Sequence, residues 1–222
     1  MSVATTDYLA AIAHLPAGAV LRIDDVSWEE YESLLGDLGD DYAVRIFYDQ
    51  GRMEIMAPAS THEKPKSVIH RLVTALSDEL DIDVESLGST TLKTEMKAKG
   101  AEPDDCFYIQ NAALVIGKED LDLMDDPPPD LVVEIDRTSM SLNRFAIYAG
   151  LRVPEIWRVV SHRVDIYLLS DEQYQKSPNS DAFPFLTAEA LSEFLTRGLA
   201  EGERKVARAF RAWVREHHRG AS

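Results

Sequence analysis

The stretch PPPDLVVEIDRTS, residues 127–139, constrains the fold most, because an apolar run there carries three acids. The run has the composition of a buried strand, and side chains alternate across a strand. Asp130, Glu134 and Asp136 therefore share one face, with Glu134 and Asp136 about 7 Å apart. Buried carboxylates are costly unless they are paired, protonated or bound to a metal. The alternatives at this point are a strand with Glu134 paired to an arginine and a strand that contributes to a functional site.

The composition is that of one soluble domain with additions, or of a domain with a helical tail. The chain has 222 residues, of which 45% are hydrophobic and 28% charged. The sole cysteine, Cys106, excludes an internal disulfide and a multi-cysteine zinc site, and it fits a reducing compartment. The first residues lack the pattern of a secretory signal, and no run of about 18 apolar residues is present. We therefore expect a cytoplasmic protein with no membrane partner.

The formal net charge of -16 argues against a protein that coats nucleic acid by electrostatics alone. It does not exclude an enzyme acting on nucleic acid, because bound divalent cations would invert the local field.

The patterns along the chain predict alternating helices and strands. Residues 27–30 form a capping box that begins a helix ending near Gly36 or Gly39. A hairpin turning at residues 49–51 follows, and then a core helix of about five turns with its cap at Thr61. Further elements are expected in this order: strands around 83–88, 89–95 and 104–110 with a turn at Lys99-Gly100, a short helix and loop at 111–129, the acid-bearing strand, a helix capped by Ser139 or Ser141, strands at 155–160 and 164–170, a surface loop at 170–181, and two closing helices starting at Thr187 and near Gly202.

An arginine stripe on the last helix is a candidate nucleic-acid contact. Its members follow each other at four- and three-residue steps: Arg204, Arg208, Arg211, Arg215 and Arg219. A stripe of this kind usually forms a solvated face or pairs with acids of a neighbouring helix, so that interpretation stands beside the functional one.

Two carboxylates are the best candidates for chemistry. Asp104 and Glu134 lie on or beside consecutive strands, so they can converge at one end of a sheet. Two carboxylates with a backbone carbonyl form a hard-oxygen site suited to Mg²⁺ or Mn²⁺. Acids at this separation are common, so the spacing alone is weak support. No Gly-rich phosphate loop, paired CxxC or GxSxG motif is present, which leaves kinase, zinc-ribbon and serine-hydrolase chemistry unsupported.

Three motifs in order carry a family resemblance: RIFYDQGRMEIMAPASTHE, EPDDCFYIQN and PPDLVVEIDRTSMSLNRFAIYAGLRVPEIWRVV. Together they resemble the Uma-two family of restriction-endonuclease-like proteins, within the PD-(D/E)XK nuclease superfamily, over about residues 42–170. The resemblance implies a mixed α+β fold of the α/β type, with a central mixed sheet flanked by helices. The expected organisation is a lead-in and helix at 1–41, the nuclease-like core at 42–170, and a loop with helices packed on the core at 171–222.

The resemblance also assigns residues. Asp104 occupies the family's first metal-binding acid and Glu134 the second, with the backbone carbonyl of Ile135 as a further ligand. Glu63, Glu102 and Asp136 are candidate supporting acids. Asp136 stands where the superfamily pattern has a lysine. In much of the family that lysine has moved to the next helix, four residues before a tyrosine, and this place is Arg144, ahead of Tyr148.

Three functions follow as alternatives. The first is a magnesium- or manganese-dependent endonuclease acting on DNA, with Arg144 stabilising the transition state and with a homodimer cutting both strands. The second is a weak or inactive member that binds a metal, nucleic acid or a protein. The third is a structural protein without a metal, in which Glu134 is salt-bridged to Arg144 or Arg137.

Overall fold

The computed structural model describes residues 5–39, 42, 44–58, 63–118, 121–136 and 143–218. Its helices, with one 3₁₀ turn, are α1 (Thr5–Ala13), α2 (Trp28–Leu38), α3 (Glu63–Leu80), η1 (Glu95–Lys97), α4 (Ala112–Val115), α5 (Arg144–Gly150), α6 (Ala188–Glu201) and α7 (Glu203–His218). Its strands are β1 (Val20–Ile23), β2 (Arg45–Asp49), β3 (Arg52–Met56), β4 (Glu85–Ser86), β5 (Leu92–Thr94), β6 (Lys99–Ala101), β7 (Asp105–Tyr108), β8 (Leu131–Asp136), β9 (Glu155–Val160), β10 (Arg163–Ser170) and β11 (Gln173–Ser177).

The strands form two sheets. The first has the order β1-β3-β2-β6-β5, and each of its neighbouring pairs is antiparallel. The second has the order β11-β10-β9-β8-β7-β4 and is mixed, because β8 and β9 run parallel while its other pairs are antiparallel. A parallel pair requires a crossover connection, and α5 lies on the one that links β8 to β9. The mixed sheet with its helices confirms the predicted fold class.

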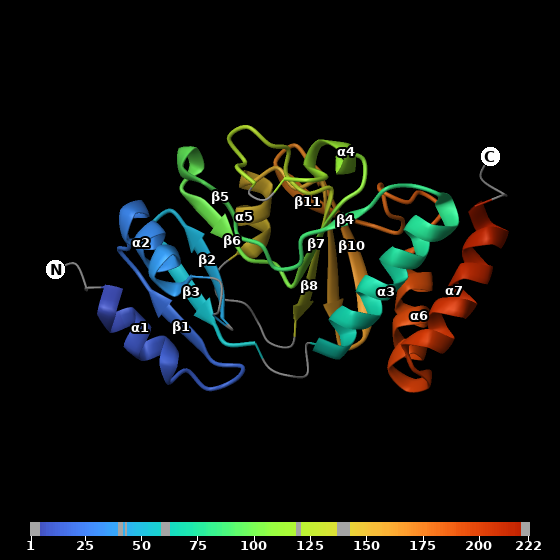
Figure 1. Ribbon diagram of the computed structural model, residues 1–222, viewed down its shortest axis with the longest axis horizontal. Helices are drawn as coiled ribbons and strands as arrows, with labels where there is room; N and C mark the ends of the chain where they lie inside the picture. Colours follow the sequence, from blue (N-terminus) through green and yellow to red (C-terminus); the bar gives the residue numbers. More distant parts are fainter. Residues whose placement is uncertain are drawn as a thin grey trace.

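The apolar faces of the strands determine how the helices and sheets form layers. Helices α1 and α2 pack on the outer face of the first sheet, and α3, α6 and α7 cover the far face of the second (Figure 1). Helix α5 lies between the sheets and contacts β2 and β6 of the first. In β2, Ile46 and Tyr48 face α2, whereas Phe47 faces the opposite way and joins Val132 and Tyr148 in the core between the sheets.

Several sequence predictions are confirmed in detail. The capping box at the start of α2 is complete, since Glu30 N donates to the Ser27 hydroxyl and Ser27 N donates to the Glu30 carboxylate. The hairpin at residues 49–51, the long core helix and the β9–β10 pair form where expected. Thr187 caps α6 by accepting a hydrogen bond from Ala190 N.

Two segments differ from the prediction. Residues 99–101 are not a turn: they form β6, which pairs with both β2 and β5, because the chain already reverses at η1 with Ala98 at φ 49°. Within the expected surface loop, residues 173–177 form the edge strand β11 after a turn at Asp171 and Glu172, both at positive φ. Period-2 alternation identifies only strands with one apolar face, and neither strand shows it: β11 is mostly polar, and β6 is the short run Lys99-Gly100-Ala101.

The cap of α5 also differs from the prediction, because Asn143 fills it by accepting a hydrogen bond from Ala146 N. Ser139, Ser141 and the predicted cap Thr61 lie outside the described residues. Within the described part of the chain, no helix is long and apolar enough to cross a membrane.

Candidate functional site

The acid-bearing strand is β8, in the interior of the second sheet between β7 and β9. Its residues alternate as predicted: Leu131, Val133 and Ile135 pack in the core beneath α3, and Val132 packs in the core between the sheets. Glu134 and Asp136 share the face of Val132, and their side chains are 2% and 6% exposed. The strand therefore presents two carboxylates to the buried layer between the sheets.

Asp104 reaches the same place from the next strand. The antiparallel register pairs Asp105 of β7 with Val133 of β8, which puts Asp104 beside the last residues of β8. The Asp104 carboxylate accepts a hydrogen bond from the backbone N–H of Ile135, at 2.7 Å from Oδ2 to N. The structure thus brings Asp104 and Glu134 together at one sheet end.

Arg144, the first residue of α5, makes an ion pair with Glu134. The distance from its Nη1 to Glu134 Oε2 is 2.6 Å, and the distance from the same nitrogen to Asp136 Oδ1 is 3.9 Å. The Arg144 residue is 4% exposed. This is the pair that the structural interpretation of the sequence predicted for Glu134.

Three contacts of this cluster were not predicted. The Tyr148 hydroxyl donates to the other Glu134 oxygen, Oε1. From the first sheet, the Phe47 ring lies 3.8 Å from the Arg144 guanidinium carbon, and Met56 Sδ lies 3.5 Å from Arg144 Nη2. The four-residue spacing of Arg144 and Tyr148 could have indicated a shared helix face. Phe47 and Met56 carry no comparable signal, because contacts between distant segments depend on the packing of the two sheets.

Asp136 makes a second ion pair, with Arg158 of β9, whose Nε lies 2.6 Å from Asp136 Oδ2. The parallel register of β8 and β9 sets Asp136 beside Val160 and Glu134 beside Arg158. The cluster therefore contains three carboxylates and two guanidinium groups, an excess of one negative charge when all five are ionised.

Burial dominates the protonation of Glu134. It raises the pKa of Glu134 to about 7; the charge of Arg144 and the hydrogen bond from Tyr148 act in the opposite direction, while Asp104 and Asp136 add to the rise. Burial alone would lower the pKa of Arg144, but the charges of Glu134 and Asp136 outweigh it, so the guanidinium stays protonated. The pKa of Tyr148 is raised by burial and by Glu134, which keeps its hydroxyl a donor.

Comparison with known families gives this cluster a context. The sequence model of the Uma2 family, described as "Putative restriction endonuclease", matches residues 28–200. The chain belongs to the Uma2 family. Membership indicates a restriction-endonuclease-like nuclease that acts on nucleic acid.

One solved structure with a similar fold is titled as a "putative nuclease belonging to DUF820" from Anabaena variabilis, with 14% sequence identity and a TM-score of 0.48. The match covers 77% of this chain and 99% of that one. No curated protein matches the chain.

The donor atoms of the predicted metal site suit a hard divalent cation, since Asp104, Glu134 and the carbonyl of Ile135 would supply oxygen alone. In this arrangement, however, both oxygens of Glu134 accept bonds, one from Arg144 and one from Tyr148. Within the described residues, no group of three or more His, Cys, Asp or Glu side chains is arranged to hold a metal. A cation at Glu134 would therefore have to share or replace the Arg144 contact.

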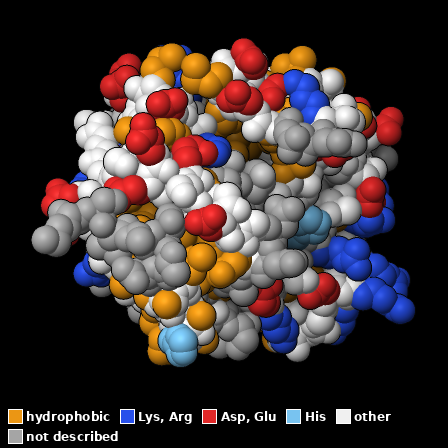
Figure 2. Space-filling model, turned by 60° about the vertical axis from the view of Figure 1, so that its left-hand side comes forward, with side chains coloured by type: hydrophobic (Ala, Val, Ile, Leu, Met, Phe, Trp, Pro, Cys, Tyr) orange, Lys and Arg blue, Asp and Glu red, His pale blue; other side chains and the backbone are white. Residues whose placement is uncertain are grey.

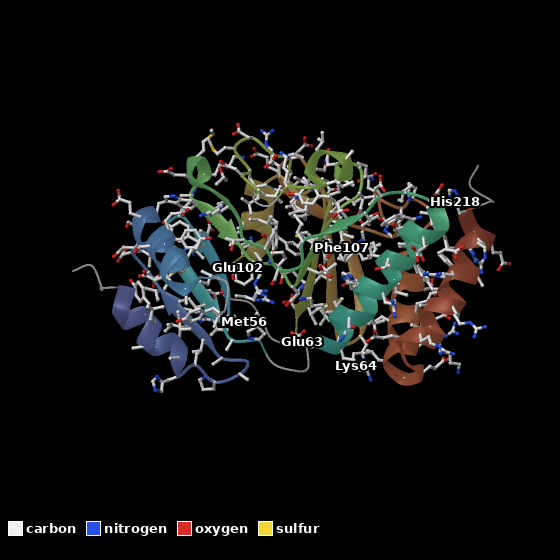
Figure 3. The ribbon with its side chains drawn as sticks, viewed as in Figure 1. Met56, Glu63, Lys64, Glu102, Phe107 and His218 are labelled. Carbon is white, nitrogen blue, oxygen red and sulfur yellow. The ribbon has the colours of Figure 1, made fainter. Side chains whose placement is uncertain are left out.

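Among the described residues, no hydrogen bond or ion pair joins the two other candidate acids to this cluster. Glu63 is exposed at the first turn of α3, and Figure 3 draws it beneath the arrowhead of β8. Glu102 accepts bonds from Ile46 N and the Thr91 hydroxyl, so it joins β2 to the segment before β5. Its pKa is raised by burial.

The arginine stripe faces α3 over part of its length. Arg211 pairs with Asp78, and Arg215 Nη1 lies 2.8 Å from Glu79 Oε2, whereas Arg204 and Arg208 are exposed and have no ion pair among the described residues. Helix α7 lies at the outer edge of the molecule, with α3 and α6 between it and the second sheet (Figure 1). Arg137 and Arg219 lie outside the described residues.

Proposed function

We propose that this protein is a divalent-cation-dependent endonuclease that hydrolyses DNA phosphodiester bonds, with Mg²⁺ or Mn²⁺ as the cation. The observation that carries the proposal is the convergence of Asp104 and Glu134 beside Arg144 in a chain of the Uma2 family. These positions match the superfamily pattern of two metal-binding acids. The proposal places this protein in the PD-(D/E)XK superfamily.

Asp104, Glu134 and the carbonyl of Ile135 would hold the cation. When bound, a divalent cation stabilises charge on a phosphodiester and lowers the pKa of a bound water. Asp104 and Glu134 would orient the attacking water. Arg144 would donate hydrogen bonds to the phosphate oxygens, since its planar guanidinium matches them and does not lose its proton. Asp136 stands where the pattern has a lysine, and among the described residues Arg144 is the cationic side chain that pairs with Glu134.

A second candidate is a weak or inactive member that binds a metal, nucleic acid or a protein. The closed pair of Arg144 and Glu134 favours it, as does the burial of all three acids. A phosphodiester reaches a buried carboxylate only if the cluster opens.

A homodimer is part of the first proposal, because cutting both strands of a duplex requires two sites.

Cleavage tests the proposal. Purified protein would be incubated with supercoiled plasmid and Mg²⁺ or Mn²⁺, beside Glu134→Gln and Asp104→Asn. Glu155→Gln is the matched control: Glu155 is an equally buried glutamate on β9, but it binds Trp157 and the backbone N–H groups of Asp181 and Ala182. We expect nicking by the wild type and by Glu155→Gln only. Equal nicking by Glu134→Gln would contradict the proposal, and Mn²⁺ binding without cleavage of any nucleic acid would favour the second candidate.

A further inference from the structure

The Arg144 guanidinium lies between two carboxylates. It contacts Glu134 Oε2 at 2.6 Å through Nη1, and the same nitrogen is 3.9 Å from Asp136 Oδ1. Arg158 binds the other Asp136 oxygen, Oδ2. Asp136 is therefore anchored on one side and presents its second oxygen toward Arg144.

The surroundings of Arg144 permit a short shift. Its guanidinium carbon lies over the Phe47 ring, a contact that depends weakly on the lateral position of the cation. Its Nε has no hydrogen-bond partner among the described residues, so no bond at that atom holds the group in place. Glu134, in contrast, is fastened by Tyr148 from α5. Arg144 is therefore the group that can shift, since its other contacts are to the Phe47 ring and to the weakly accepting sulfur of Met56.

We propose that Arg144 and a divalent cation exchange at Glu134, with Asp136 receiving the arginine when the cation binds. This inference rests on the proposed cation site. Breaking a buried ion pair leaves an uncompensated charge and is strongly destabilising, so Glu134 becomes available to a cation at low cost only if a second carboxylate accepts Arg144. Asp136 at the lysine position has this role, and it acts on cation binding through Arg144 and not as a ligand.

The exchange predicts whether each variant raises or lowers the affinity for the cation. Arg144→Gln removes the competitor, so the cation binds more tightly. Asp136→Asn removes the receiving group, so Arg144 stays on Glu134 and the cation binds more weakly. General electrostatics predicts the same two signs, because one change removes a positive charge and the other a negative charge. A matched charge control and a double mutant separate the two explanations.

Arg158→Gln is the matched control, because it removes one positive charge from the same acidic cluster, and the Arg158 guanidinium pairs with Asp136 and not with Glu134. Calorimetric titration with Mn²⁺ and with Mg²⁺ would be run on the wild type, Arg144→Gln, Arg158→Gln, Asp136→Asn and the double variant Arg144→Gln/Asp136→Asn. We expect Arg144→Gln to tighten binding about tenfold or more, a usual size for coupling between two sites, and Arg158→Gln to change it far less. In the Arg144→Gln background, Asp136→Asn should have only a small effect, comparable to that of Arg158→Gln.

Equal tightening by Arg144→Gln and Arg158→Gln would overturn the exchange in favour of general electrostatics. A full effect of Asp136→Asn in the Arg144→Gln background would overturn it in favour of Asp136 as a ligand. If no protein in the set binds either cation, the proposed cation site itself is wrong. If all the proteins bind the cation with the same affinity, only the exchange is refuted.

A measurement on the wild type covers the case in which Arg144→Gln does not fold. The side-chain Nε–H signal of Arg144, identified by its loss in Arg144→Lys, would be followed by nuclear magnetic resonance during Mg²⁺ titration. We expect it to shift with the midpoint given by calorimetry. An Arg144 signal that is unchanged at saturating Mg²⁺ would overturn the proposal.

Discussion

At the scale of single residues, the key feature is Glu134, a buried acid whose burial disfavours its charged form. It is 2% exposed, and burial raises its pKa to about 7. Arg144 and Tyr148, which lie four residues apart on α5, offset part of that cost by contacting one carboxylate oxygen each. The sequence indicated that the acid on this strand needed a partner, but several types of partner would satisfy the same requirement.

Tyr148→Phe should destabilise the protein more than Tyr108→Phe. The Tyr148 hydroxyl donates to a buried carboxylate, whereas the Tyr108 hydroxyl donates to the backbone carbonyl of Pro127. Hydrogen bonds to charged groups contribute about 1.5–3 kcal/mol and neutral ones about 0.5–1.5 kcal/mol. Urea unfolding of both variants at pH 8, where Glu134 is mainly ionised, measures the difference. Equal losses would show that Tyr148 contributes packing alone.

At the scale of elements, α3 is attached to both the second sheet and the C-terminal helices. Its apolar side chains pack on β8 and on α6 and α7, and His70 adds a polar link, with Nδ1 at 2.9 Å from Asp105 Oδ2 on β7. The side chains of Asp105 and Asp104 therefore lie on opposite faces of the sheet, with Asp105 on the face that α3 covers. The apolar periodicity of α3 predicted its burial, but the link from His70 to Asp105 depends on the register of the helix against the strand.

The link between His70 and Asp105 should make stability depend on pH. The hydrogen bond to Asp105 raises the pKa of His70 above its ordinary value near 6.5. Because the folded state holds the proton more tightly, this stabilisation is fully present below about pH 6.5 and is lost as the pH rises through the raised pKa. The difference in unfolding free energy between the wild type and His70→Asn should therefore shrink from pH 6 to pH 9. A constant difference would contradict this assignment.

The close approach of α6 to its neighbours depends on Gly198. A Cβ at this position would lie 2.6 Å from Val68 Cγ1 of α3 and 3.1 Å from Val206 Cγ1 of α7. Gly198→Ala should therefore destabilise the protein by about 1–3 kcal/mol, a usual cost of overpacking. Gly36→Ala is the control, because Gly36 is also helical and a Cβ there meets nothing within 4 Å. It should be neutral or stabilising by up to about 1 kcal/mol in the same unfolding experiment.

At the scale of the whole molecule, the cluster belongs to both sheets. Phe47 and Met56 of the first sheet contact Arg144. Arg144 lies on the crossover connection that follows β8 of the second sheet. The molecule is also strongly acidic, with a net charge of -16. Figure 2 shows acidic side chains spread over the upper part of one face, with Lys and Arg gathered at the lower right. Binding of a polyanion therefore requires a local source of positive charge.

Binding of DNA should accordingly depend on the divalent cation. In chelator at about 150 mM salt we expect no measurable change in the fluorescence anisotropy of a labelled duplex, because the protein's charge repels the phosphates. Adding Mn²⁺ should produce binding in the wild type and in Glu155→Gln, but not in Asp104→Asn. Equal binding by all three proteins with and without Mn²⁺ would contradict this prediction.

Local patterns were sufficient for much of the fold and for the family, because capping boxes, helical periodicity and the ordered motifs are read over a few residues each. They found α2, α3, β8 and the acids Asp104 and Glu134. They missed the short strand β6 and the mostly polar strand β11, because both segments become strands only by pairing with neighbours. They also left the partner of Glu134 undecided. Only the packing of two sheets around α5 places Arg144 and Tyr148 on that carboxylate, with Phe47 over the arginine, because burial and distance between remote segments exist only in the folded chain.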